Sequence, residues 1–378
     1  MQYPESNPNA KTDYRAMDEE LTDVLKPEEP KKVKESRPLI RKRNFKPIIM
    51  CLAVAMLSFQ GLSAHIQGAV SLGLQYTDNL FQLSDYDFDR YQQDHPNLTY
   101  AETMDDLQLT TRIDLEYPIH YRWWKFTPSI TGILQQNLSN TDKYRQDTML
   151  RLRVDRHYWN FTALYGYYPY IYYRHYNDTD GTGVLEKYSY ARNQYRADLQ
   201  IKPIDNTTVL LGIRKEDFYY NQYFTEADGS VLQSRIGLRY RFPTFTVEGN
   251  YEYRSFDNDG AERMNDDDGS YDSNIYRGKV SMHPLPFKGE STRDYSWQPY
   301  LELSKEDRYF QGMNSWYGGR ADHILTTKAG MNMKLTPRWN LSLDYSHLFR
   351  NVDSPNGSVV QLKEYSENRI SATVKYNF

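Results

Sequence analysis

The sequence of 378 residues predicts an all-β protein, a transmembrane antiparallel up-and-down β-barrel of about 14 strands, within a range of about 12 to 16. Two observations predict this fold class. Only 39% of the residues are hydrophobic and the mean hydropathy is -0.82, yet 35 residues are Tyr. Segments in which apolar and polar residues alternate recur along the chain, with the two-residue period of a strand whose faces meet different surroundings. A barrel with a wet lumen needs only alternate apolar residues, and Tyr gathers where its ring meets lipid and its hydroxyl meets water.

Composition alone fits other folds equally well. A soluble β-sandwich, or a Tyr-rich carbohydrate-binding surface, would have similar residue content. The formal net charge of -4 is too small to favour a nucleic-acid partner. The order of the residues along the chain therefore has to decide between these folds.

The first 64 residues predict an export signal. A basic flank at 41–46 precedes an apolar run at 48–59 and small residues that end at Ala64, where we expect cleavage. The run is shorter than the roughly 20 residues of a spanning helix, although an inner-membrane signal anchor is the alternative. Residues 1–46 are charged and Pro-rich, so we expect a disordered leader, explained by a start site placed upstream of the true one or by a genuine cytoplasmic extension. The barrel is expected over 65–378.

The chain has one cysteine, Cys51, and it lies in the apolar segment 47–64 that we expect to be removed. The mature chain would then contain no thiol. It would have neither a disulfide framework nor a thiolate metal site.

The segments after the leader predict the strands in order. We expect them at 70–76, 107–117, 126–136, 148–155, 161–173, 195–202, 209–213, 235–242, 245–254, 275–282, 295–303, 325–335, 339–347 and 363–378. Pro299 weakens the expectation for 295–303, because proline removes a ladder donor. The segment 161–173 is dense in Tyr on both faces, which predicts a constriction or a sugar-stacking surface inside. Single-chain bacterial barrels have an even number of strands.

The connections predict one topology. Short reversals contain a proline, and with the carboxy terminus in the periplasm they all fall on the periplasmic side: Pro118, Pro203, Pro243, Pro286 and Pro337. The longer connections would face outward, and two of them are acidic, with Asp85, Asp87, Asp89 and Asp94 in the first and Asp257, Asp259, Asp266, Asp267 and Asp268 in the fifth. Neither cluster has the spacing of a calcium loop, so we expect solvated charged loops.

Charged residues on alternate strand positions predict a polar, water-filled lumen, because burying so many charges in a packed soluble core would strongly destabilise the fold. The candidate lumen-lining residues are Arg112, Arg151, Arg153, Arg196, Arg235, Arg239, Arg241, Glu248, Glu252, Arg254, Arg277 and Lys279, with Lys202, Arg214, Lys328 and Lys334 beside them. In the hairpin 235–254 the Arg and Glu side chains would pair across the strands. A basic bore would concentrate anions, whereas a self-neutralising charge ladder would only stiffen the wall.

The histidines do not predict an enzyme. His157, His175, His323 and His347 have no spacing that identifies a nucleophile or a metal site, and Ser346 and His347 fall on opposite faces of one strand. We expect no catalytic residue, no metal and no cofactor.

The ends of the predicted barrel resemble known families. Residues 370–378 alternate up to Phe378, which resembles the closing strand of bacterial outer-membrane β-barrels, where the terminal Phe and apolar positions such as Tyr376 are recognised by the barrel-assembly machinery. Residues 70–81, VSLGLQYTDNLF, resemble the first strand of β-barrel porins of exopolysaccharide-operon type, and 271–276 is a looser echo of its terminal turn.

The resemblance implies a passive conduit in the cell outer membrane. Small solutes or a polysaccharide for export would pass, and a basic bore would add a preference for anionic cargo. The partners would be outer-membrane lipid, lipopolysaccharide and the assembly machinery, with no nucleic acid. A non-conducting structural or adhesion barrel with acidic surface loops is the alternative, followed by a barrel lipid hydrolase.

Overall fold

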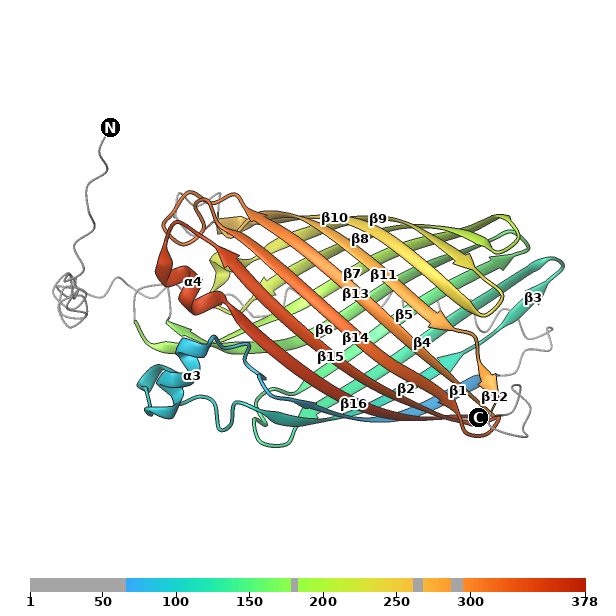
Figure 1. Cartoon of the computed structure of the whole chain (residues 1–378), viewed down its shortest axis with the longest axis horizontal. Coiled ribbons are helices and arrows are strands. Elements are labelled where there is room, and N and C mark those ends of the chain that lie inside the picture. The colour runs from blue at the N-terminus through green and yellow to red at the C-terminus, as the bar shows by residue number, and fades with distance from the viewer. Residues whose placement is uncertain (1–65, 178–182, 261–267, 287–294) are drawn as a thin grey trace. The chain divides into compact units, whose positions relative to one another are not determined.

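The strands of the chain form one closed antiparallel barrel in the computed structural model, which describes residues 66–177, 183–260, 268–286 and 295–378. The expected export signal, its cleavage site at Ala64, Cys51, Asp266 and Asp267 lie outside the described residues. Each strand pairs with its neighbours, β1 also pairs with β16, and β11 pairs with β13, so the sheet has no open edge (Figure 1). Of the sixteen strands in this sheet, two are very short, β3 and β12, so fourteen described strands build the wall and the predicted fold class is confirmed.

The strands are β1 (Gln67–Thr77), β2 (Asp106–Glu116), β3 (Ile119–Tyr121), β4 (Trp124–Asn137), β5 (Arg145–Arg156), β6 (Trp159–Asn177), β7 (Leu185–Ile204), β8 (Thr207–Tyr220), β9 (Gly229–Arg241), β10 (Phe245–Asn258), β11 (Tyr271–Met282), β12 (Leu285–Pro286), β13 (Ser296–Phe310), β14 (Ala321–Lys334), β15 (Trp339–Asp353) and β16 (Tyr365–Asn377). The helices are α3 (Asp85–Gln92) and α4 (Gly357–Lys363), with 3-10 turns η1 (Pro96–Leu98) and η2 (Thr225–Ala227). None of the helices in the described part of the chain is long and apolar enough to cross a membrane.

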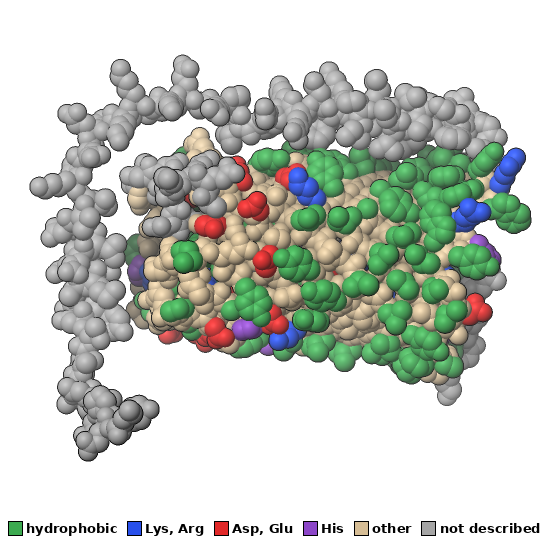
Figure 2. Space-filling view, turned by 90° about the horizontal axis from the view of Figure 1, so that it is seen from above, with side chains coloured by type: hydrophobic (Ala, Val, Ile, Leu, Met, Phe, Trp, Pro, Cys, Tyr) green, Lys and Arg blue, Asp and Glu red, His purple; other side chains and the backbone are tan. Residues whose placement is uncertain are grey.

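Burial in this barrel is the reverse of burial in a soluble protein. On β1, Leu72 and Leu74 are 56% and 48% exposed, whereas Ser71 and Thr77 are 6% and 3% exposed. Figure 2 shows hydrophobic side chains spread over the outer surface of the wall. Because strand side chains alternate, the same sequence pattern places apolar groups outward, where only lipid can cover them, and polar groups in the bore.

The two ends of the barrel differ. Short connections gather at one end, which we call the turn end; there the backbone N–H of Asn377 donates to the carbonyl of Arg338, beside the carboxy terminus. The other end, which we call the loop end, carries α3 and α4 (Figure 1). Exposed aromatic side chains, such as those of Trp123 and Phe378, lie at the turn end, where a membrane barrel has its aromatic girdle.

Among the prolines that lie within strands, Pro169, Pro203 and Pro299 are at places where a ladder is interrupted or ends. Pro169 and Pro203 coincide with register shifts in the β6–β7 and β7–β8 pairs, where a bulge leaves an N–H without a ladder partner anyway. Pro299 belongs to β13, although it weakened the sequence-based expectation for that strand. The β11–β13 ladder begins only at Tyr300, so the missing donor of Pro299 costs the sheet little.

The first long connection is folded, which the sequence did not predict. Ser84 caps α3 by accepting a hydrogen bond from the Asp87 N–H at 3.2 Å. The buried side chains around it form a small loop core: Phe81, Leu83, Leu98, Ala101, Met104 and Tyr172 of β6. The expectation that Asp87 is solvated is wrong, since it is 6% exposed and lies 3.4 Å from Arg90 and 3.9 Å from Arg174.

Candidate functional site

Three inward-facing residues on adjacent strands form a row across the middle of the wall. Asp198 of β7, Gly212 of β8 and Arg235 of β9 are register partners. Arg235 donates to Asp198 at 2.7 Å, past the intervening strand. A Cβ at Gly212 would lie 2.8 Å from the Asp198 carboxylate, so only glycine leaves room for this ion pair across two strand spacings.

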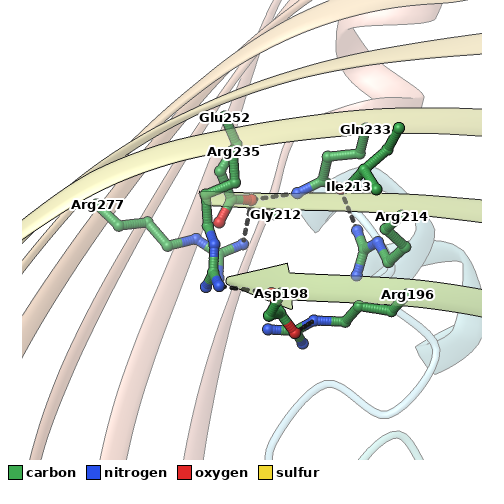
Figure 3. Close-up of a pocket in the computed structure, with 9 residues that line it drawn as sticks. All are labelled: Arg196, Asp198, Gly212, Ile213, Arg214, Gln233, Arg235, Glu252 and Arg277. Atoms are coloured by element: carbon green, nitrogen blue, oxygen red, sulfur yellow. Dashed lines mark hydrogen bonds and ion pairs between the residues drawn. The ribbon is translucent and has the colours of Figure 1, made fainter. Parts of the chain in front are cut away.

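This row borders a cavity of about 180 Å³, which we call the bore cavity (Figure 3). Four guanidinium groups surround it, from Arg196, Arg214, Arg235 and Arg277, against two carboxylates, Asp198 and Glu252. Gln233 links the two sides, accepting from Arg214 and donating to Glu252. The side chain of Arg277 is 40% exposed and that of Arg214 is 25% exposed, so part of each guanidinium group can be reached from the bore.

A second cavity of about 400 Å³ continues the bore toward the turn end. It shares Arg235, Glu252 and Arg277 with the bore cavity and adds Arg239, Glu248, Lys279 and Glu302. Together the two cavities have six basic and four acidic side chains, an excess of two positive charges. Low-dielectric walls strengthen the field of such an excess.

Most of the candidate lumen residues have acidic partners. Across the hairpin of β9 and β10, Arg239 pairs with Glu248 at 2.7 Å, whereas Arg235 reaches Asp198 instead of its register partner Glu252. The other pairs are Arg112–Asp114, Arg153–Asp155, Arg196–Asp198, Arg254–Glu306, Arg277–Glu252 and Lys279–Glu302, at 2.6 to 3.7 Å. Arg151 lies half-buried on β5, and Arg241 is exposed at the turn end of β9. The bore is therefore a charge ladder with a modest basic excess.

Many of these pairs join residues two apart on one strand. The spacing Arg-x-Asp puts both side chains on one face, and it recurs at Arg112–Asp114, Arg145–Asp147, Arg153–Asp155, Arg196–Asp198 and Arg320–Asp322. The sequence contains this signal plainly. This spacing favours the self-neutralising charge ladder, one of the two interpretations of the bore that the sequence leaves open, over a strongly basic bore.

The loop end of the bore holds a buried ionic group that sequence reasoning missed. Asp322 has a fully buried side chain, and it accepts hydrogen bonds from Arg320 at 2.9 Å and from Arg350 at 2.5 Å. Aromatic rings cover the cations: Arg320 lies 4.4 Å from the centroid of Phe310, and Arg308 lies 4.5 Å from that of Tyr271. We use the name mouth cluster for the following residues: Asp322, Arg320, Arg350, Arg308, Phe310, Tyr271 and Arg174.

Two half-buried lysines of the loop-end connections extend the mouth cluster. Lys143 lies 4.5 Å from the centroid of Phe81 and donates to the carbonyl of Leu80 at 3.2 Å. Lys363, at the end of α4, lies 5.3 Å from the centroid of Trp316. Burial, reinforced by the positive charge of Arg174, lowers the pKa of each lysine to about 7.

The charge of the mouth should therefore change near neutral pH. A lysine is positive below its pKa, so lowering the pH from about 9 to about 6 would add up to two positive charges there. We expect the anion-to-cation permeability ratio to rise across this window, as measured by reversal potentials. A variant with Lys143→Met and Lys363→Met should lose most of this pH dependence; an unchanged pH profile would show that other groups cause it.

His323 and His347, two histidines of the wall, contact acidic or amide side chains. His323 lies 2.7 Å from Asp307 and 3.3 Å from Asp353, and His347 lies 2.9 Å from the amide oxygen of Asn368. Within residues 66–177, 183–260, 268–286 and 295–378, no group of three His, Cys, Asp or Glu side chains is placed to hold a metal ion. These contacts are ones that ordinary structural histidines make.

Solved structures similar to this chain include several outer-membrane proteins. No family model and no curated protein sequence matches the chain. An anion-selective porin from Comamonas acidovorans is 11% identical, with a TM-score of 0.43, over 84% of this chain and 99% of that chain. The outer membrane channel DcaP of Acinetobacter baumannii is 11% identical, with a TM-score of 0.43, over 83% and 97%. A bacterial polysaccharide outer membrane secretin is 9% identical, with a TM-score of 0.42, over 82% and 98%.

The structure of the barrel wall indicates that the protein spans a membrane. The wall is closed, so no backbone group at an open edge has to meet lipid. Its outer face is apolar between the two ends, and its inner face is charged. These are the properties of a transmembrane barrel, and the chain forms a closed transmembrane β-barrel.

Proposed function

We propose that this barrel is a porin-like channel through which small anionic solutes pass, without a cofactor and without an enzymatic step. The observation that carries the proposal is the pair of connected bore cavities with six basic and four acidic side chains. A basic excess between low-dielectric walls raises the local concentration of anions. The partly exposed guanidinium groups of Arg214 and Arg277 would replace part of the hydration shell of a passing anion.

An acidic polysaccharide for export is the second candidate cargo. The mouth cluster interleaves guanidinium groups with aromatic rings, as at Arg308 over Tyr271. Such a surface can take up both the carboxylates and the apolar ring faces of sugars. Either cargo would cross passively.

Conductance in planar lipid bilayers tests the proposal. The full-length barrel, shown to be folded by heat-modifiable gel migration, should give discrete steps, and a salt gradient should give a reversal potential on the anion side. Cation selectivity would overturn the anionic preference. A folded but silent barrel would favour the structural or adhesion barrel with outward loops.

We also propose that Tyr376 and Phe378 serve as the assembly signal. The Phe378 backbone exchanges two hydrogen bonds with Gly68, at 2.9 and 3.0 Å, so the terminal residue closes the β1–β16 seam. Phe378→Ala keeps these backbone bonds but removes the ring that the assembly machinery would read. We expect the amount of barrel in the outer membrane to fall several-fold, while the purified variant still folds in detergent.

The matched control for this prediction is Phe349→Ala. Phe349 is an exposed aromatic residue on the neighbouring β15, 46% exposed against 59% for Phe378. Quantitative immunoblots of membrane fractions compare the variants. Equal losses in both would indicate that lipid-facing area, and not a terminal signal, sets the yield.

A further inference from the structure

A cavity of about 340 Å³ lies at the loop end of the bore, and it shares no lining residue with the two cavities described above. Its walls come from β1, β2, β4, β5, β6 and β16 and from the first two loop-end connections. Its volume is within the range of small-molecule sites, about 300 to 1,000 Å³. We call it the amide cavity, after the residues that dominate one wall.

Three amide side chains form a row across adjacent strands. Gln75 of β1 is the register partner of Gln108 of β2, which is in turn the partner of Asn137 of β4. Adjacent strands lie about 4.8 Å apart, so the row presents an amide group at each such step. Gln135 lies two residues before Asn137 on the same face and also lines the cavity.

The amide row has unused hydrogen-bonding capacity. Gln108 donates to the Asn137 oxygen at 3.0 Å, but the Nδ2 atom of Asn137, a residue only 1% exposed, is buried without a partner among the described residues. In the described part of the chain, the side chains of Gln75 and Gln135 likewise make no hydrogen bond. Each amide can donate two hydrogen bonds and accept two, so the row suits a ligand rich in hydroxyl groups.

Tyrosine rings provide another part of the lining. Tyr144, Tyr172 and Tyr173 line the cavity, and Tyr144 stacks on Tyr170 with centroids 5.0 Å apart and planes at 22°. The Tyr173 hydroxyl donates to Gln82 at 3.4 Å. Aromatic faces of this kind suit the C–H face of a pyranose ring, whose hydroxyl edge would then meet the amides.

The charges of the cavity are mostly neutralised. Arg145 pairs with Asp147 at 2.8 Å, and Arg369 pairs with Glu367 at 2.5 Å. Lys143 remains, and three aromatic rings lie near its ammonium group. This balance differs from the guanidinium excess of the bore cavity and does not favour a phosphate-like anion.

We propose that the amide cavity binds a saccharide unit, held by amide hydrogen bonds along its hydroxyl edge and by tyrosine rings. The inference deepens the proposed channel function, because it places a binding step for a sugar cargo at the mouth. The site itself requires only the residues of the inner wall and the neighbouring loops.

Saturation-transfer NMR on the full barrel in detergent micelles tests the site, with maltotriose, cellotriose and trigalacturonate as probes. We expect at least one probe to bind the unaltered barrel. A variant with Gln75→Leu and Gln135→Leu should bind it at least tenfold more weakly, because it loses amides that the wall itself does not use. The matched control is Gln146→Leu, since Gln146 is exposed on β5 as the register partner of the outward-facing Leu134.

Heat-modifiable migration checks that each variant folds. If the double variant does not fold, Tyr144→Ala, which removes one of the lining tyrosine rings, takes its place. Absence of binding by all three probes, or equal binding by the cavity variant and the control, would overturn the proposal. Conductance of the same preparations separates the two hypotheses. A conducting barrel without sugar binding removes the saccharide site alone, and a silent barrel that binds removes the channel alone.

Discussion

Replacing Asp322 by Asn should destabilise the barrel by about 3 to 5 kcal/mol, the cost of breaking a buried ion pair. The Asp322 side chain is 0% exposed, and the side chains of Arg320 and Arg350 are 3% and 12% exposed. Asn keeps the shape of the residue but leaves two guanidinium groups buried beside a neutral partner. Urea unfolding in lipid vesicles, followed by tryptophan fluorescence, measures the change.

Asp155→Asn is the matched control for this prediction. Asp155 pairs with Arg153 at the same two-residue spacing on one strand, yet those side chains are 28% and 51% exposed. Water screens this pair, so its loss should cost less than about 1 kcal/mol. Equal losses at the two positions would contradict a buried mouth cluster.

Neutralising Arg214 and Arg277 should remove most of the anion preference of the channel. Both guanidiniums border the bore cavity and have an unpartnered Nε. An interaction of about 1 kcal/mol between each charge and a passing ion corresponds to about a fivefold effect. We therefore expect Arg214→Gln and Arg277→Gln each to lower the anion-to-cation permeability ratio by about fivefold at low salt, and by less at 1 M salt, where screening is strong.

Lys215→Gln controls for the loss of one positive charge on β8. Lys215 follows Arg214 but is exposed on the outward side of the strand, where it pairs with Asp217 at 3.3 Å. Reversal potentials in a salt gradient should not change in this variant. A shift as large as that of Arg214→Gln would show that charge outside the bore sets selectivity.

The sequence was informative where structure is local. Alternation along each strand placed the wall, its even strand number and the short turns, because a strand face is determined by residues two apart. The same spacing could have located the Arg-x-Asp pairs, and the Ser84-x-x-Asp87 spacing could have located α3.

The loop end could not be predicted in this way. The loop core joins Phe81 to Tyr172 of β6, two residues far apart in the chain. Similarly, α4 begins at Gly357, where alternation predicted no helix, and its Lys363 meets Trp316 of another connection. These contacts form because connections far apart in the sequence pack against one another. The alternation of apolar and polar residues along a strand carries no information about such packing.

Single-cysteine labelling tests the central claim, a lipid-facing outer wall around a water-filled bore, most directly. Ser281 lines the cavity toward the turn end, while its neighbour Val280 is 43% exposed on the outer face. With Cys51→Ser as background, Ser281→Cys or Val280→Cys would provide the only thiol of the chain. In lipid vesicles, a charged, membrane-impermeant thiol reagent should modify the cysteine at 281 and not the one at 280. Modification at 280 with protection at 281 would contradict the account.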